Sequence, residues 1–119
     1  MTTPTIDSLH QQWIAAFNSY NLDEHVALYR SDAMLFGSIP ELVIGRDAIR
    51  AYFGNRGPNV RVARYPFPRV IMLRDDIAAT ASHVDFADGD TPMPYRVTWM
   101  LVKEQGNWLI AQHHGSLRI

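Results

Sequence analysis

Hydrophobic residues recur with one period in the first part of the chain and with another in the second. The N-terminal segment predicts a long amphipathic helix, because its large apolar residues recur every three or four positions at Ile6, Leu9, Trp13, Phe17 and Tyr20. Thr3 and Pro4 are typical of the start of such a helix. From Val60 onward apolar and polar residues alternate, which is typical of strands.

Shorter elements connect these two regions. Asn21, with Glu24 three residues later, resembles a capping box and predicts a second helix that ends near Ser31. Breaker residues then delimit a strand at 33–36, a third helix at 47–53 stopped by Gly54, and a loop at 55–59. The expected strands are 60–74, interrupted at Pro66 and Pro68, then 77–87, followed by a loop at 87–94 and a closing hairpin at 95–119. This order predicts one α+β domain over residues 1–119, in which three N-terminal helices pack on a curved antiparallel sheet and leave a cone-shaped pocket.

The register of the closing hairpin decides which of its side chains share a face. We place Lys103 opposite Trp108, and alternate residues of a strand point to opposite faces. The face toward the pocket then holds Val97, Trp99, Leu101, Ile110, Gln112 and His114. The outer face holds Arg96, Thr98, Met100, Leu109, Ala111, His113 and Leu117. We therefore expect His113 and His114 to point in opposite directions, with only His114 in the pocket.

Composition narrows the class of protein. The 119-residue chain is 47% hydrophobic and 19% charged, which is typical of a folded domain with a core. A net charge of −1 gives no reason to expect nucleic acid or a membrane as partner. The absence of cysteine excludes disulfides and thiolate zinc sites. The sequence has neither a secretory signal pattern nor an apolar run of about 18 residues, so we expect a cytoplasmic protein.

Three segments resemble the nuclear transport factor 2-like superfamily, and the resemblance covers essentially the whole chain. Its SnoaL-like and ketosteroid isomerase-like members open with a helix-helix-strand unit similar to WIAAFNSYNLDEHVALYRSDAMLFG. The association domain of calcium/calmodulin-dependent protein kinase II has a strand-Gly-helix segment similar to ELVIGRDAIRAYF. The terminal strand of this group is similar to GNWLIAQHHGS, where Trp108, His114 and Ser116 match and Gln112 stands at the place of a further His. The resemblance implies the cone-shaped fold.

The same resemblance indicates which catalytic groups are missing. The catalytic Asp of ketosteroid isomerases follows the first strand, and its place here is about Gly37. Their oxyanion-donor Tyr falls at Trp13, and no carboxylate stands at 96–98, where their second oxyanion acid falls. Proton abstraction next to a carbonyl needs a base and a donor to the oxyanion. The sequence therefore argues against ketosteroid isomerase activity.

The best candidate for the pocket is His114, because a neutral imidazole offers one donor and one acceptor. It is also the best candidate for a catalytic group. The other expected ligand-binding residues share its face or come from the helices: Gln112, Trp99, Trp13, Tyr20 and Tyr52. The alternative is a core histidine bonded to the backbone or to Ser116, with the aromatic residues as ordinary core.

A second group lies on the outer face of the predicted sheet and consists of His83, Asp85, Arg96 and His113. We expect it at a homodimer interface, because Met100 and its neighbours place apolar area on the same face. The alternative is a solvated ion pair. A register error of one residue would reverse the side chains and make this group the site, with His83 as base and Asp85 as its orienting partner.

No metal and no cofactor are expected. Adjacent histidines on a strand cannot face one ion, and the sequence has no HxH or HExxH pattern. Two functions stay open. The first is a SnoaL-like protein that binds a small hydrophobic or cyclic molecule, as an isomerase, cyclase or hydrolase. The second is a non-catalytic oligomerisation or ligand-binding domain similar to the kinase association domain.

Overall fold

The computed structural model describes residues 5–118. Over this range the chain forms the helices α1 (Ile6–Asn18), α2 (Leu22–Val26) and α3 (Arg46–Gly54). Its strands are β1 (Tyr29–Phe36), β2 (Val43–Ile44), β3 (Val60–Arg64), β4 (Arg69–Arg74), β5 (Ile77–Asp88), β6 (Thr91–Glu104) and β7 (Asn107–Leu117). The predicted helix start at Thr3 and Pro4 lies outside the described residues. Within them, the Thr5 side chain caps α1 by accepting the Ser8 N–H at 3.0 Å.

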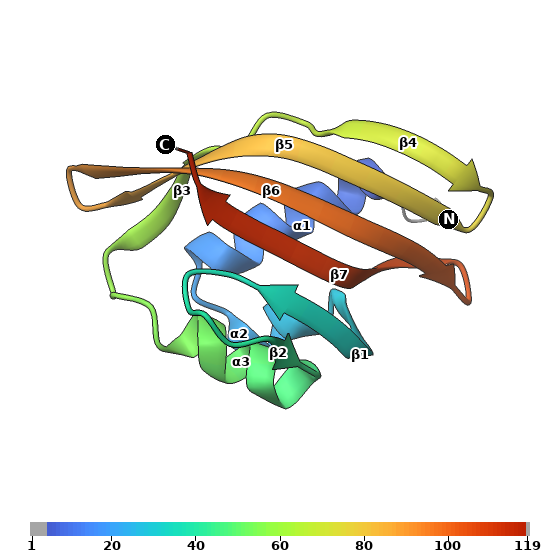
Figure 1. Ribbon diagram of the computed structural model, residues 1–119, viewed down its shortest axis with the longest axis horizontal. Coiled ribbons are helices and arrows are strands. Elements are labelled where there is room, and N and C mark those ends of the chain that lie inside the picture. Colours follow the sequence, from blue (N-terminus) through green and yellow to red (C-terminus); the bar gives the residue numbers. More distant parts are fainter. Residues whose placement is uncertain (1–4, 119) are drawn as a thin grey trace.

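Helix α1 packs its apolar stripe against the sheet. Leu9, Trp13 and Phe17 are buried, and the Trp13 ring lies 5.8 Å from that of Trp99 on β6. Burial of each such side chain contributes about 1.5–3 kcal/mol, so this contact ties the helix to the sheet. Figure 1 shows α1 across one face of the sheet, with α2 and α3 beside it.

One curved, open sheet carries the fold. Its strand order is β2-β1-β7-β6-β5-β3, and β4 pairs with β5 as well. Five strand pairs are antiparallel, and the pair of β1 with β7 is parallel. The structure confirms the predicted α+β class, with N-terminal helices on a curved sheet (Figure 1).

Two element boundaries differ from the expected ones. The second helix ends at Val26, and Tyr29 begins β1, where the strand carries its ring into the fully buried core. The loop expected at 87–94 is a tight turn around Gly89, whose φ of 58° favours glycine. The strands β5 and β6 therefore stay paired out to Asp88 and Thr91.

The predicted register of the closing hairpin is correct near the turn and wrong at the far end of the hairpin. Lys103 pairs with Trp108 as predicted. Further along β7, Ala111 is an extra residue, a β-bulge, so the residues after it point to the face opposite to the expected one. As a result His113 pairs with Trp99 and is buried, with 6% of its surface exposed, whereas His114 is exposed.

Candidate functional site

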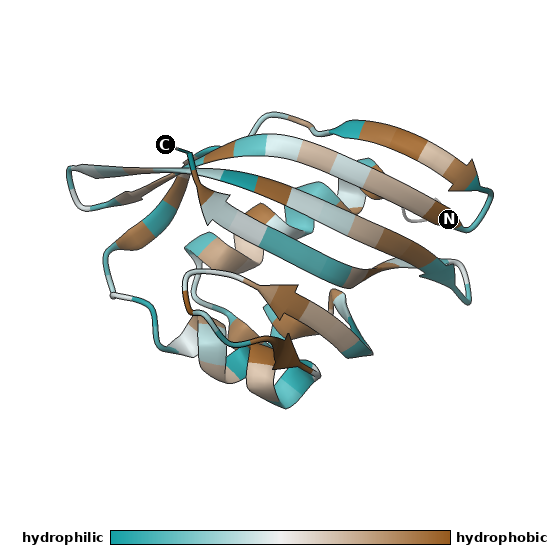
Figure 2. Ribbon diagram, in the orientation of Figure 1, coloured by the Kyte–Doolittle hydropathy of each residue, from teal (hydrophilic) through white to brown (hydrophobic). Residues whose placement is uncertain are grey.

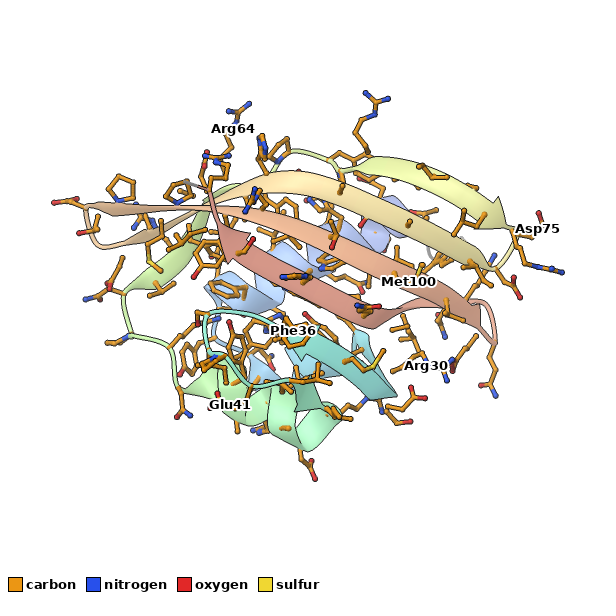
Figure 3. The ribbon with its side chains drawn as sticks, viewed as in Figure 1. Arg30, Phe36, Glu41, Arg64, Asp75 and Met100 are labelled. Atoms are coloured by element: carbon orange, nitrogen blue, oxygen red, sulfur yellow. The ribbon has the colours of Figure 1, made fainter. Side chains whose placement is uncertain are left out.

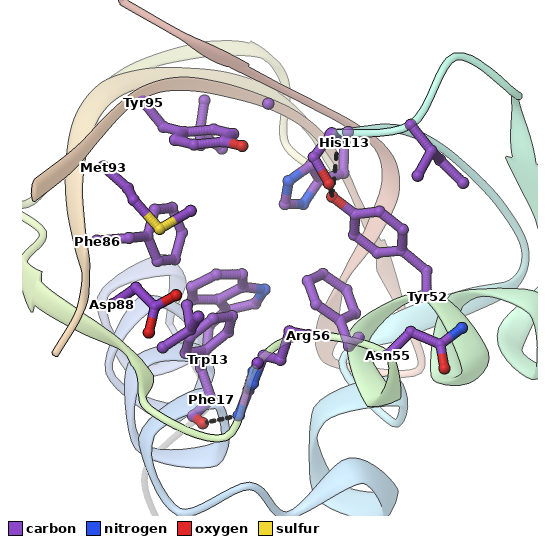
Figure 4. A pocket seen from close by; sticks show the side chains of 18 residues that line it. Trp13, Phe17, Tyr52, Asn55, Arg56, Phe86, Asp88, Met93, Tyr95 and His113 are labelled. Atoms are coloured by element: carbon purple, nitrogen blue, oxygen red, sulfur yellow. Dashed lines mark hydrogen bonds between the residues drawn. The ribbon is translucent and has the colours of Figure 1, made fainter. Parts of the chain in front are cut away.

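A cavity of about 360 Å³ lies between α1, α3 and the inner face of the sheet (Figure 4). This volume is near the lower end of the range for small-molecule sites, about 300–1,000 Å³. A pocket is thus present where the cone was expected to have one. Its size suits a ligand of one or two rings.

Aromatic rings form much of the cavity wall. Trp13 and Phe17 of α1 stack with ring centroids 5.3 Å apart, and Phe86 of β5 lies 5.2 Å from Phe17. Phe53 of α3 meets Trp13 edge to face at 6.2 Å. Such a wall offers flat apolar area for a ring of the ligand.

A chain of hydrogen bonds holds His113 in the wall. The indole N–H of Trp13 donates to the Tyr29 hydroxyl at 2.9 Å, and that hydroxyl lies 2.9 Å from Nδ1 of His113. The indole N–H of Trp99 also donates to this Nδ1, at 3.1 Å. These four side chains are buried, so their mutual bonds replace the water that they lose on folding.

This chain fixes the tautomer of His113. An indole N–H can only donate, so Nδ1 accepts and the neutral ring has its proton on Nε2. Burial, with a smaller contribution from the nearby His114, lowers the pKa of His113 to about 3. The ring is therefore neutral at pH 7 and acts as a hydrogen-bond donor through Nε2.

The Nε2 side of the ring faces residues that line the cavity. A Cβ added to Gly115 would lie 3.4 Å from Nε2 of His113 and 3.7 Å from the ring of Tyr95, and all three residues line the cavity. Burial raises the pKa of the Tyr95 hydroxyl, the Tyr52 hydroxyl raises it further, and a hydrogen bond with the Ser38 side chain opposes this shift. Tyr95 is thus a neutral phenol beside the His113 donor.

Tyr52 adds a further hydroxyl from α3. Its oxygen accepts the backbone N–H of Ser38 at 2.9 Å and lies 3.2 Å from the Ser38 hydroxyl. Figure 4 shows the Tyr52 hydroxyl on the same side of the cavity as His113 and Tyr95. The cavity therefore has one polar end, built from an imidazole and three hydroxyls.

Charged groups line another part of the cavity. The Arg56 guanidinium lies over the rings of Phe17, at 3.7 Å, and Tyr20, at 4.4 Å, and donates to the Phe17 carbonyl. Burial lowers the pKa of Arg56, whose Nε and Nη1 have no partner among the described residues. Figure 4 shows the Asp88 carboxylate on the wall formed by the end of β5.

The six expected ligand-binding residues lie at different places. Trp13 and Tyr52 line the cavity, while Trp99 lies behind it and holds His113. Tyr20 lies outside the lining, and its hydroxyl donates to the Gly54 carbonyl at 2.6 Å. The expected pocket positions of Gln112 and His114 are wrong, because the bulge turns both to the exposed outer face.

The second group of candidates is divided between the two faces. His83 pairs with Arg96 on the outer face, and Asp85 forms an ion pair with Arg118 at 2.7 Å. Only His113 turns inward, so its predicted place beside the other three is wrong. The slip of one residue considered above affects the end of β7 alone, because the bulge lies in that strand.

Sequence reasoning missed several cavity residues. Phe86 and Asp88 continue the inner face of β5, and Tyr95 continues that of β6 with Met93. Their alternation is in phase with the buried Val84, but Asp88 and Met93 lie in the segment 87–94 that was predicted to be a loop. If the alternation of the two strands is continued up to the turn at Gly89, it predicts that these residues face the cavity.

Two absences apply to residues 5–118. No three acidic or histidine side chains in this range are grouped as metal ligands would be. None of the three helices described is long and apolar enough to cross a membrane.

Comparison with known proteins agrees with this fold. A family model described as a SnoaL-like domain matches residues 6–119. The chain has no match among curated proteins. Similar solved structures include proteins described as NTF2-like and as having a cystatin-like fold, and the present chain has this fold.

Three solved structures illustrate the range of the similarity. A ketosteroid isomerase-like protein from Erwinia carotovora atroseptica is 21% identical, with a TM-score of 0.83 over 98% of this chain and 96% of that chain. A putative scytalone dehydratase from Novosphingobium aromaticivorans is 15% identical, with a TM-score of 0.84 over 96% and 82% of the two chains. A putative calcium/calmodulin-dependent protein kinase II association domain from Xanthomonas campestris is 25% identical, with a TM-score of 0.75 over 95% and 85%.

Proposed function

Because the chain belongs to the SnoaL-like domain family, we propose that its cavity binds a small, largely apolar cyclic molecule that carries an oxygen able to accept hydrogen bonds. The aromatic wall supports a ring-shaped ligand, and the volume of about 360 Å³ supports a small one. The observation that carries the proposal is the fixed tautomer of His113. Its Nδ1 is occupied by Trp99 and Tyr29, so Nε2–H is left to donate to a ligand.

A titration with 1-indanone tests this proposal, because this bicyclic ketone combines a flat apolar body with one acceptor oxygen. The indole N–H resonance of Trp13 should move in a saturable way, since this residue lines the cavity. The indole resonance of Trp108 is the internal control, because that residue lies outside the cavity lining. If the two resonances respond alike, or neither responds, the proposal is wrong.

Gly115→Ala is the matched variant. The added methyl would lie 3.4 Å from Nε2 of His113 and shield it, while its other neighbours stay at ordinary contact distances of 3.7 Å. Loss of the hydrogen bond should weaken 1-indanone binding about tenfold, which corresponds to about 1.4 kcal/mol. An unchanged affinity in this variant would remove His113 from the ligand contact.

A second candidate function is proton transfer next to a carbonyl, and Asp88 favours it. The sequence argued against this activity because no carboxylate stands at the usual places, yet Asp88 lines the cavity from the end of β5 (Figure 4). In such a step the carboxylate takes a proton from the carbon beside the carbonyl. The C–H electrons form a C=C bond, and the carbonyl oxygen becomes an enolate that accepts from Nε2 of His113.

Deuterium exchange at C2 of 1-indanone in D₂O distinguishes catalysis from binding alone. Asp88→Asn should abolish exchange above the buffer rate, whereas Asp90→Asn, in the adjoining turn, should not. Binding without exchange in the wild-type protein would favour the alternative function, a non-catalytic ligand-binding or assembly domain.

A homodimer through the outer face of the sheet is part of the same proposal. One row of side chains crosses that face through paired residues on six strands, and most of them are apolar: Ile44, Met34, Gln112, Met100, Ala79 and Ile71. Figure 2 shows hydrophobic residues along β1 and β4, and Figure 3 labels Phe36 and Met100 on the face turned away from α1. Exposed apolar area of this kind usually marks a partner surface. His113 is excluded from this contact by its burial, while His114 belongs to the outer face.

A cytoplasmic location stays a prediction from the sequence.

A further inference from the structure

The space beside Gly37 is filled by the side chain of Tyr52, a contact that the sequence does not reveal. A Cβ added to Gly37 would lie 2.5 Å from Cζ of Tyr52 and closer still to the hydroxyl oxygen. The glycine therefore leaves room for the Tyr52 hydroxyl, which reaches across from α3 to the end of β1. Any side chain at position 37 must displace it.

The backbone next to Gly37 holds this hydroxyl in place. The Ser38 N–H donates to the Tyr52 oxygen at 2.9 Å, so that oxygen acts as an acceptor and its own proton is not used in this bond. The Ser38 hydroxyl lies 3.2 Å from the same oxygen, and either of these two hydroxyls can be the donor. Two hydroxyls linked in a row have two protons and use one of them on each other. One proton is left for a partner outside the row.

The free proton of this row and the Nε2–H of His113 lie at the same polar end of the cavity. Figure 4 shows the Tyr52 hydroxyl, Tyr95 and His113 on the same side of the cavity, and the Tyr95 ring lies beside Gly115, next to Nε2. The Arg56 and Asp88 side chains stand elsewhere on the wall in Figure 4. An oxygen with two lone pairs at this end meets two donors.

We infer that Tyr52, positioned by Gly37 and Ser38, is the second donor to the ligand oxygen and so determines specificity for a carbonyl compound. This inference rests on the proposed function of the cavity and deepens it. A carbonyl oxygen accepts both hydrogen bonds, whereas a hydrocarbon ring leaves both donors desolvated and unpaired. The ligand class is therefore a small cyclic ketone, held by His113 on one lone pair and by the hydroxyl row on the other.

Affinities for 1-indanone and for its parent hydrocarbon indane test the inference. The wild-type protein should prefer the ketone by about tenfold to a hundredfold, since each hydrogen bond contributes up to about tenfold. Tyr52→Phe should lower this preference about tenfold, because the ketone loses one hydrogen bond and indane no longer leaves the Tyr52 hydroxyl unpaired. Tyr65→Phe is the matched control, because that buried tyrosine lies outside the cavity lining and the preference should stay as in the wild type.

Gly37→Ala gives an independent measurement. It leaves every cavity side chain in the sequence but pushes the Tyr52 hydroxyl away, so it should lower the preference as much as Tyr52→Phe does. The double variant should lose no more than either single variant, because both act on one hydroxyl. Thermal melts check the fold, and if Gly37→Ala does not fold, the Tyr52→Phe result decides.

The outcomes separate the two proposals. If neither compound binds the wild-type protein, the proposed function of the cavity fails. If both bind with equal affinity, or if Tyr52→Phe keeps the full ketone preference, the cavity still binds small molecules and the role of Tyr52 is wrong. Additive losses in the double variant would also overturn it, since Gly37 would then act by another route.

Discussion

The two adjacent histidines of β7 have opposite surroundings, because one lies on the inner face of the sheet and the other on the outer face. On the inner face His113 is buried, bonded through Nδ1 to Tyr29 and Trp99, and limited to one tautomer. On the outer face His114 is exposed and lies beside the Phe36 ring, with centroids 5.7 Å apart. The same residue type therefore becomes a fixed donor on one side and a surface group on the other, and the bulge at Ala111 decides which is which.

The faces also differ in where their apolar residues lie. The inner face encloses its apolar residues around a cavity, and hydrogen bonds hold His113 and Tyr52 at the polar end of that cavity. The outer face leaves Met100 and Ile71 uncovered, with 37% and 64% of their surfaces exposed. Concave area with positioned donors suits a small molecule, and flat apolar area suits another protein surface.

Acid should destabilise the inner face first, and this is the largest effect that we expect. Burial lowers the pKa values of His25 and His113 to about 3, while both return to about 6.5 in the unfolded chain. Between these two pKa values the unfolded state binds more protons than the folded state. The free energy of unfolding therefore keeps its full value above pH 6.5 and decreases as the pH falls below 6.5. At pH 4.5 the loss should be about 2.7 kcal/mol for each of the two rings. Burial lowers the pKa of His10 as well, in the same direction.

Urea denaturation between pH 7.5 and 4.5 measures this loss. His113→Leu should remove the contribution of His113 to the pH dependence of the free energy of unfolding, because the variant has no imidazole there to take up a proton on unfolding. A free energy of unfolding that stays level down to pH 4.5 would show that these imidazoles are accessible to water in the folded protein.

Replacing each of the two adjacent histidines compares the faces directly. His113→Leu leaves the Trp99 N–H and the Tyr29 hydroxyl without their shared acceptor, which should cost about 2–3 kcal/mol at pH 7. His114→Leu changes an exposed side chain and should cost less than about 0.5 kcal/mol. Urea melts of both variants give these differences. Equal losses, or a larger loss for His114, would contradict the observed register.

The outer face should respond to a charge placed in its apolar row. Met100→Glu puts two carboxylates near each other across a twofold contact and should weaken the homodimer at least about tenfold. Met72→Glu is the matched control, because that exposed residue lies on β4 next to the row residue Ile71 but on the alternate face. Sedimentation at micromolar concentration measures both. A monomeric wild-type protein, or a dimer that survives Met100→Glu, would rule out this interface.

Much of the fold could be predicted because its signals are local. The stripe from Ile6 to Phe17 and the alternation after Val60 both follow from which residues need burial. The end of β7 could not be predicted in the same way. After Ile110 the chain reads AQHHGS, which has no large apolar residue to show which positions face the core. The bulge lies where β7 pairs with both β1 and β6, and no local pattern marks it, so the predicted site histidine was His114 and not His113.

The cavity itself was predictable only in part. Trp13 and Tyr52 were expected in it and line it, because long aromatic side chains on a helix point toward the sheet. The role of Gly37 depends on the reach of Tyr52 from another element, and no local pattern carries that information. Contacts between residues far apart in sequence define the polar end.

The protonation state of each His113 nitrogen is the most direct test of the account. Nitrogen-15 NMR of the side chain, assigned by comparison with His113→Leu, reports which nitrogen carries a proton. We expect Nε2 to show a one-bond coupling to hydrogen and Nδ1 to show none at pH 7, with the same state persisting down to about pH 4. A proton on Nδ1, or an imidazolium at pH 7, would contradict the account, because His113 would then not present a fixed neutral donor to the cavity.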